Sequence, residues 1–147
     1  MKPSIVFKKI WQDTDMVELT ISVADGRSLF QCDVYVGHET LAEAIEQMDT
    51  FKGHVYGGLS DLRFGEFGPE YANGAFHARF EFHRSGNGKL SVTAKAESGW
   101  NEFTHTMVAS NVTLFLRTEP VLFNNWLNSL KGLANGTRDD AILECIQ

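Results

Sequence analysis

A strictly alternating stretch in the middle of the chain constrains the fold more than any other. Between residues 75 and 83, apolar side chains take one set of alternate positions and polar side chains take the other. The two sets are Phe76, Ala78, Phe80 and Phe82, and His77, Arg79, Glu81 and His83. Successive side chains of a β-strand point to opposite faces of its sheet. The stretch therefore predicts a strand with one buried face and one face in water.

The same period of two recurs at residues 17–23, 30–36, 90–96 and 112–116, and residues 5–11 and 61–67 are also expected to form strands. Asp25-Gly26 separates two of these stretches and is typical of a hairpin turn. The composition of residues 85–88 indicates another turn. Residues 100–110 fit either a bulged strand or a loop with a short strand. The pattern predicts antiparallel strands joined by short connections.

Two segments have helical spacing instead. Leu41, Ile45, Met48 and Phe51 form one apolar stripe, and Thr40 with Glu43 predicts a capping box at its start. The second stripe follows Thr118, which is expected to cap it, and consists of Leu122, Phe123, Trp126, Leu127, Leu130 and Leu133. A short third helix is predicted over residues 137–146. The two main stripes register with an offset of 82 residues, which raises the hypothesis of an internal repeat.

These elements predict a single α+β domain over residues 1–147. The expected order is three strands and a helix, then four strands, a helix and a short C-terminal helix. About seven strands would form one antiparallel sheet, with both main helices on the same face of it. The polar strand face on the other side would be left in water.

Composition excludes several functional classes. The net charge of −6 repels nucleic-acid phosphates, and no basic patch is apparent along the chain. No window approaches the ~18 apolar residues of a membrane span, and lysines interrupt the N-terminal apolar run. Cys32 and Cys145 lack the paired spacing of a zinc or redox motif, which favours reduced structural thiols. We therefore expect a cytoplasmic protein that binds neither nucleic acid nor membrane.

The first helix has an acidic outer face. Glu39, Glu43, Glu46 and Asp49 lie on it, with Lys52 as the nearby cation. Solvation and the helix dipole account for such a face, but it is also suited to a basic protein partner. These four residues are the candidate partner-binding set.

The polar strand face is the alternative site. His77, Arg79, Glu81 and His83 would line up along it and could bind a small ligand or serve an enzyme. The two histidines would lie roughly 20 Å apart along one strand, too far to share a metal ion. Cross-strand pairing with Lys95, Glu97 or Arg117 explains the same residues without a ligand. The sequence has no nucleophile elbow, phosphate-binding loop or HExxH motif, so no catalytic residue, metal or cofactor is predicted.

The layout of the whole chain resembles a known group of proteins. DTDMVELTI opens the second strand, an LxxxI helix follows, then DLRFGE, and a late strand leads into an LxxxWLxxL helix. This order is similar to that of the small immunity proteins of bacterial polymorphic toxin systems, including the wall-associated toxin immunity group. The resemblance implies a cytosolic protein that binds and blocks a toxin domain without catalysing a reaction.

Sequence and resemblance together favour a non-enzymatic inhibitor of a basic toxin or effector domain. Two alternatives stay open. One is the ligand binder or enzyme that uses the polar strand face. The other is an oligomeric structural or regulatory protein, with a homodimer that pairs through a sheet edge or through the helix face of Asn124, Asn125 and Asn128.

Overall fold

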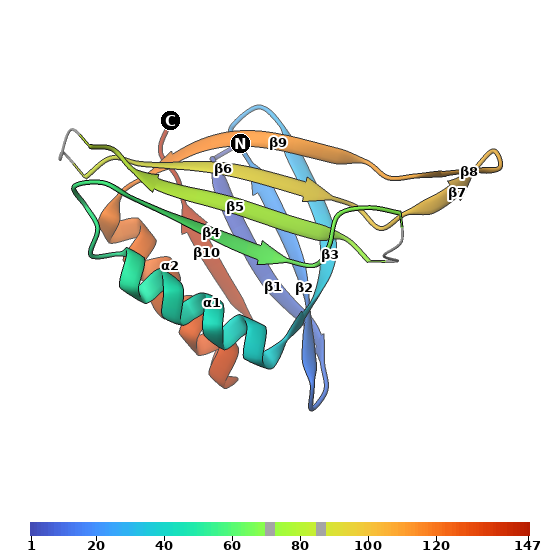
Figure 1. Ribbon diagram of the computed structural model, residues 1–147, viewed down its shortest axis with the longest axis horizontal. Coiled ribbons are helices and arrows are strands. Elements are labelled where there is room, and N and C mark those ends of the chain that lie inside the picture. The colour runs from blue at the N-terminus through green and yellow to red at the C-terminus, as the bar shows by residue number, and fades with distance from the viewer. Residues whose placement is uncertain (70–72, 85–87) are drawn as a thin grey trace.

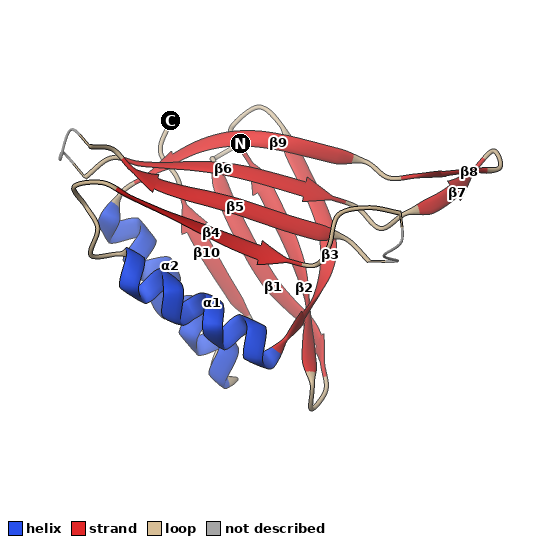
Figure 2. Cartoon of the chain, in the orientation of Figure 1, coloured by secondary structure: helices blue, strands red, loops and turns tan. Residues whose placement is uncertain are grey.

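The structure is a computed structural model that describes residues 1–69, 73–84 and 88–147. The described part is an α+β fold with two helices and ten strands, and every strand pair is antiparallel (Figures 1 and 2). Most of the predicted turn at residues 85–88 lies outside the described residues. The predicted α+β class is confirmed.

Sheet A contains the N-terminal strands and the last strand of the chain. Its strands are β1 (Ser4–Gln12), β2 (Met16–Ala24), β3 (Leu29–Gly37) and β10 (Asp140–Glu144), in the order β10-β1-β2-β3. The predicted hairpin turn joins β2 to β3. Asp25 Oδ1 accepts the amide hydrogens of Arg27 (2.9 Å) and Ser28 (2.7 Å), and Gly26 has a φ of 99°, which favours glycine.

Sheet B contains the alternating strand around Phe80. Its strands are β4 (Gly58–Phe64), β5 (Ala75–Phe82), β6 (Leu90–Glu97) and β9 (Asn111–Thr118), in the order β4-β5-β6-β9. Phe76, Ala78, Phe80 and Phe82 are buried as predicted. Residues 100–110 form a third, two-stranded sheet of β7 (Asn101–Phe103) and β8 (Thr106–Val108), which projects from the end of β6 and β9 (Figure 1).

The two helices lie side by side along one flank of the molecule (Figure 2). α1 (His38–Phe51) contacts β4 and β3, and α2 (Pro120–Asn135) contacts β10. Every residue of the two stripes registered by the 82-residue offset is buried: Leu41, Ile45, Met48 and Phe51 on α1, and Phe123, Leu127, Leu130 and Leu133 on α2.

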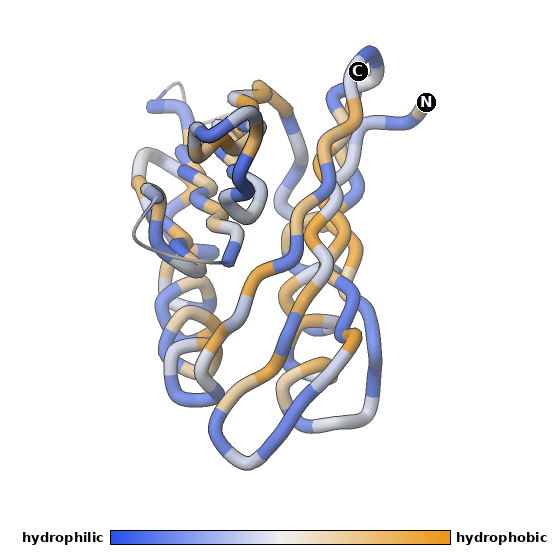
Figure 3. Tube along the Cα trace, turned by 90° about the vertical axis from the view of Figure 1, so that its right-hand side faces the viewer, coloured by the Kyte–Doolittle hydropathy of each residue, from blue (hydrophilic) through white to orange (hydrophobic). Residues whose placement is uncertain are grey.

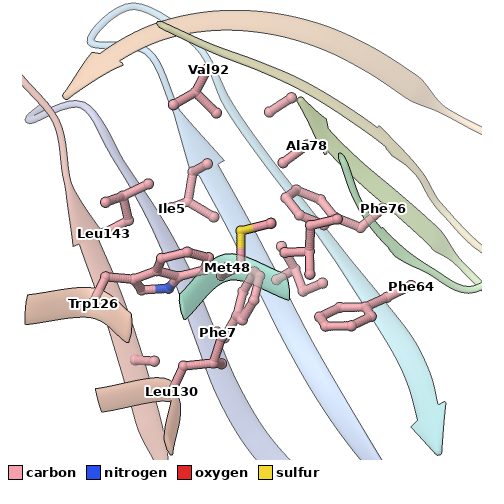
Figure 4. Close-up of a cluster of buried hydrophobic side chains, with 14 of the residues drawn as sticks. Ile5, Phe7, Met48, Phe64, Phe76, Ala78, Val92, Trp126, Leu130 and Leu143 are labelled. Atoms are coloured by element: carbon pink, nitrogen blue, oxygen red, sulfur yellow. The ribbon is translucent and has the colours of Figure 1, made fainter. Parts of the chain in front are cut away.

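One hydrophobic core joins the two sheets and the helices. Hydrophobic and hydrophilic residues alternate along the strands (Figure 3), and the apolar positions of both sheets belong to one buried cluster. Trp126 belongs to this cluster and lies near Phe7 of sheet A, with the two rings 5.8 Å apart (Figure 4). Its ring is also 5.5 Å from that of Phe80 in sheet B. The helix residue therefore links the two sheets.

The prediction of one sheet was wrong. α1 separates β3 from β4, so β4 begins a second sheet instead of extending the first. α1 follows β3, an edge strand of sheet A, and α2 follows β9, an edge strand of sheet B. The helices share a flank, as expected, but they do not cover one face of a single sheet, because α1 contacts β3 and β4 and α2 contacts β10.

The predicted C-terminal helix was also wrong. Ala141 and Leu143 are buried while their neighbours are not, and the segment pairs with β1 as β10. Thr137 does not cap a new helix. Its amide hydrogen-bonds the carbonyl of Gly132 at 2.9 Å and so closes the end of α2.

Both predicted helix caps were wrong for a tertiary reason. α1 begins at His38, whose amide donates to the Asp15 carbonyl at 3.0 Å, so the helix starts two residues before Thr40 and Gly37 is at the N-cap position. The Thr118 hydroxyl donates to the Glu144 carbonyl in β10 at 2.8 Å, and Glu119 takes the N-cap position of α2. Neither described helix is long and apolar enough to cross a membrane.

Candidate functional site

The acidic residues of α1 lie on the side of the helix away from the core. Glu39, Glu43 and Glu46 are exposed, because the buried stripe occupies the opposite side. None of the three forms an ion pair with another residue that the structure describes. Their charge is available to a partner.

Asp49 differs from the other three acids. Its Oδ1 lies 2.9 Å from Lys52 Nζ and 2.9 Å from Lys131 Nζ on α2. The hydrogen bond from Lys52, followed by that from Lys131, lowers the pKa of Asp49 below its ordinary value. The sequence had suggested Lys52 as the only nearby cation, but Lys131 also pairs with Asp49. Asp49 therefore joins the two helices.

A groove runs between α1 and the edge strand β4. Its volume is about 490 Å³, and Glu43 and Glu46 lie on its helix side, with Leu59 and Ser60 on the strand side. Phe51 contributes an apolar wall. A long basic side chain has an aliphatic stem and a charged end, and a groove with both apolar and acidic walls suits it.

The polar face of sheet B forms a second candidate site. The register places Arg63, His77 and Lys95 in one row across β4, β5 and β6. The next row contains Asp61, Arg79, Thr93 and Phe115. Cationic side chains outnumber acidic ones in these rows, which the linear sequence did not reveal.

Asp61 organises the middle of this face. Its Oδ1 lies 2.8 Å from His77 Nε2 and accepts a hydrogen bond from Arg79 Nε at 2.9 Å, while its Oδ2 accepts one from Arg79 Nη2 at 3.2 Å. The Arg79 hydrogen bonds, and secondarily that of His77, lower the pKa of Asp61 to about 2. The carboxylate thus neutralises the arginine beside it.

The four residues proposed for the alternative site do not converge. His77 and Arg79 share Asp61, whereas His83 Nε2 lies 2.6 Å from Ser91 Oγ on β6. Glu81 is exposed between them, opposite Leu59 and Ser91. Within the described residues, no three His, Cys, Asp or Glu side chains are placed to hold a metal ion.

The anticipated cross-strand partners were also incomplete. Glu97 is buried and accepts hydrogen bonds from the Gly68 amide (3.0 Å) and Trp100 Nε1 (3.1 Å), so it does not pair with the histidines. Asp61 pairs with His77 and was not among the predicted partners. The inward positions of Leu62 and Phe64 could have placed Asp61 on the polar face.

Both cysteines lie away from these surfaces. Cys32 and Cys145 are free and buried, and burial raises the pKa of each thiol to about 12. Each therefore behaves as a small apolar side chain.

The chain matches no protein-family model, no curated protein and no solved structure.

Proposed function

We propose that this chain is a non-enzymatic binding protein that recognises a basic protein domain through the outer face of α1, as an immunity-type inhibitor does with its toxin. The observation that supports the proposal is the row of exposed carboxylates of Glu39, Glu43 and Glu46, which form no ion pair with any residue that the structure describes. Glu43 and Glu46 also line the groove along β4. Charge without a partner among the described residues can pair across an interface.

The rigid mounting of α1 supports the same proposal. Its apolar stripe is buried, Asp49 ties it to α2, and His38 Nε2 lies 2.8 Å from the Asp13 carbonyl at its start. Acidic side chains on a fixed helix need little ordering when a partner arrives, so less conformational entropy is lost on binding. The inhibitor would act in the cytoplasm, where two free thiols persist.

A capture experiment tests the proposal. The tagged chain is incubated with a lysate of the source organism, and bound proteins are identified by mass spectrometry. We expect a basic protein that is lost when Glu43→Lys and Glu46→Lys are introduced together. Recovery of acidic proteins only, or of none, would remove the hypothesis.

Association kinetics with the purified partner give the second test. Electrostatic steering is screened by salt, so the association rate constant should fall steeply between low ionic strength and about 0.15 M, where the Debye length is ~8 Å. An association rate constant that does not change with salt would contradict recognition by the acidic face.

A further inference from the structure

The strand β4 forms the edge of sheet B that lies nearest to α1 (Figure 1). An edge strand leaves half of its backbone amides and carbonyls without a strand partner, and such a row of groups can pair with another chain. Proteins commonly block an edge with a proline or a β-bulge. β4 contains no proline, and its pairing with β5 runs over its whole length without a register shift. The edge is therefore suited to pairing with one more strand.

The hydrogen bonds of β5 show which side each residue faces. The His83 amide donates to the Lys89 carbonyl at 3.1 Å, directly beyond the last pair of β5 with β6. Backbone hydrogen bonds alternate along antiparallel strands, so every second residue of β5, counted from His83, directs its amide and carbonyl toward β6. The residues between them, which include Phe80, direct theirs toward β4.

The same alternation continues in β4. Ser60 lies opposite Phe80 and therefore bonds β5 through its backbone. The amides and carbonyls that point away from β5 belong to Leu59, Asp61 and Arg63. No backbone hydrogen bond between residues that the structure describes uses these groups. They are available to a strand that is not part of this fold.

Two grooves border this edge. The groove of about 490 Å³ has Leu59 and Ser60 of β4 on one side and α1 on the other. A second groove, of about 270 Å³, is lined by Arg63 and Phe64 of β4 and by Thr40 near the start of α1. The edge of β4 therefore adjoins open space near both of its ends.

The helix side of the larger groove is acidic. Glu43, Glu46, Gln47 and Thr50 line it and recur at helical spacing, so they belong to one face of α1. Among the described residues that line this groove, none is a lysine or an arginine. A chain that enters the groove beside β4 would thus meet two carboxylates and no fixed cation.

The spacing of these carboxylates matches that of an extended chain. The ring of Phe51 on α1 stacks on that of Phe82 at 4.9 Å, so α1 covers the inner face of sheet B, and inward side chains of an added strand would point toward this helix. Such side chains recur about every 6.6 Å along a strand. Glu43 and Glu46 are three residues apart, which puts their Cβ atoms about 5–6 Å apart. Two basic side chains at alternate positions can therefore each reach one carboxylate.

We propose that an extended segment of the basic partner adds to sheet B as a strand antiparallel to β4, with lysine or arginine side chains at alternate positions directed at Glu43 and Glu46. Main-chain hydrogen bonds to Leu59, Asp61 and Arg63 hold the segment, and the acidic side of the groove selects its charge. The inference rests on the proposed function, because it states how the same face of α1 recognises its partner.

A peptide with the sequence Thr-Lys-Thr-Lys-Thr-Lys-Thr is the probe. It is added to the isotope-labelled full chain, and amide hydrogen exchange is followed by NMR. With peptide at about ten times its dissociation constant, exchange at Leu59, Asp61 and Arg63 should slow roughly tenfold, because only the free fraction exchanges. Ser60 and Leu62 should change little, since their amides already bond β5.

A matched pair of variants at the edge tests the main-chain bonds. Leu59→Pro removes an amide that points away from β5, so the ladder with β5 is kept, whereas Leu59→Thr keeps that amide. Leu59→Pro should weaken peptide binding by at least about fivefold, the usual effect of one lost hydrogen bond. Leu59→Thr should bind as the wild type does, because the Leu59 side chain is exposed.

A second peptide tests the spacing of the charges. Thr-Thr-Lys-Lys-Lys-Thr-Thr has the same composition and charge but lacks the alternation. The wild type should prefer the alternating peptide, and Glu43→Gln with Glu46→Gln should abolish the preference. Equal affinity of the wild type for both peptides contradicts the proposed arrangement of the strand.

Circular dichroism and the melting temperature establish that Leu59→Pro is folded. If it is not, the alternating peptide methylated on its threonine amides replaces it, because these amides would bond β4. Unchanged exchange at Leu59, Asp61 and Arg63 overturns the strand addition, as does undiminished binding after either change.

These failures are distinct from failure of the proposed function. A basic protein that the wild type captures from the lysate, and that is lost with Glu43→Lys and Glu46→Lys, would leave recognition by α1 standing even if β4 pairs with no peptide. Capture of no basic protein would remove the proposed function, whatever the peptides do.

Discussion

The outer face of α1 and the polar face of sheet B are both rich in charge, but they differ in whether the carboxylates have ion-pair partners. On α1, Glu39, Glu43 and Glu46 are exposed and form no ion pair within the described residues. On sheet B, the Asp61 carboxylate is shared by His77 and Arg79. The α1 face presents its carboxylates to the solvent, whereas on sheet B the Asp61 carboxylate is paired with Arg79 within the sheet.

This difference has consequences for what each face can bind. A charge that already has a partner loses that interaction, or part of it, when a ligand competes for it. An unpaired exposed charge loses only hydration and can steer a partner from a distance. The α1 face is therefore suited to recognition, and the pairs on sheet B are suited to holding β4 against β5.

The largest expected effect is on partner binding at the α1 face. Glu43→Lys with Glu46→Lys should slow association with the basic partner about tenfold, because steering charge is reversed where the partner docks. The melting temperature should stay close to that of the wild type, since both side chains are exposed. Stopped-flow kinetics and thermal denaturation measure the two quantities.

A matched variant separates local charge from overall charge. Glu81→Lys with Glu102→Lys changes two exposed acids, one on β5 of sheet B and one on β7, and both double variants have a net charge of −2 instead of −6. Only the α1 variant should lose most of its association rate. Equal slowing by both would show that the overall charge, and not the α1 face, guides the partner.

The next effect concerns stability at the sheet B face. Asp61→Asn should lower the free energy of unfolding by about 1 kcal/mol at neutral pH, a value reduced from the full pKa shift because the site is partly exposed. The folded pKa of about 2 lies below the ordinary 3.8, so Asp61 stabilises the fold above pH 3.8 and loses this contribution as pH falls toward 2. Urea titrations at several pH values should show the gap between wild type and variant closing over that interval. A gap that persists at pH 2 would assign the effect to something other than the carboxylate charge.

A smaller effect is expected at Asp49, which lies on α1 but is ion-paired, as Asp61 is on sheet B. Asp49 is the one acid of the α1 set that has ion-pair partners, and one of them, Lys131, lies on α2. Asp49→Asn should lower the melting temperature less than Asp61→Asn does, because the side chain of Asp49 is 43% exposed and that of Asp61 is 24% exposed. It should also slow partner association less than Glu43→Lys with Glu46→Lys. Stronger loss of binding from Asp49→Asn would place the contact nearer the C-terminal end of α1.

The sequence predicted the elements whose period is decided locally. The alternation around Phe80 and the stripe around Ile45 each report one buried face, and both were correct in the structure. The C-terminal segment failed because Ile142, Leu143 and Ile146 fit a helical turn as well as a strand. The free edge of β1, which β10 occupies, decides between the two, and that edge exists only in the folded chain.

The two candidate sites differ in the same respect: local periodicity predicts one of them, and the other depends on tertiary pairing. The acids of α1 could be predicted to face outward, because helical spacing fixes their position relative to the buried stripe. The pairing on sheet B could not, because it depends on the register between β4 and β5. The predicted strand over residues 61–67 starts three residues late and puts Asp61 at its end, whereas the observed β4 places it at the centre, opposite Arg79.

The smallest expected effect separates the two histidines of the polar face. His83 is exposed and contacts Ser91, so His83→Gln should change the free energy of unfolding by less than about 0.5 kcal/mol. His77 has a side chain that is only 14% exposed and hydrogen-bonds Asp61, so His77→Gln should cost more than His83→Gln but less than Asp61→Asn, because Arg79 still pairs with the carboxylate. Urea denaturation of the single variants and of His77→Gln in an Asp61→Asn background measures the coupling between His77 and Asp61. If His77→Gln costs the same with and without the Asp61 carboxylate, the two side chains are independent. His77 would then take no part in the charge pairing that distinguishes the sheet B face from the α1 face.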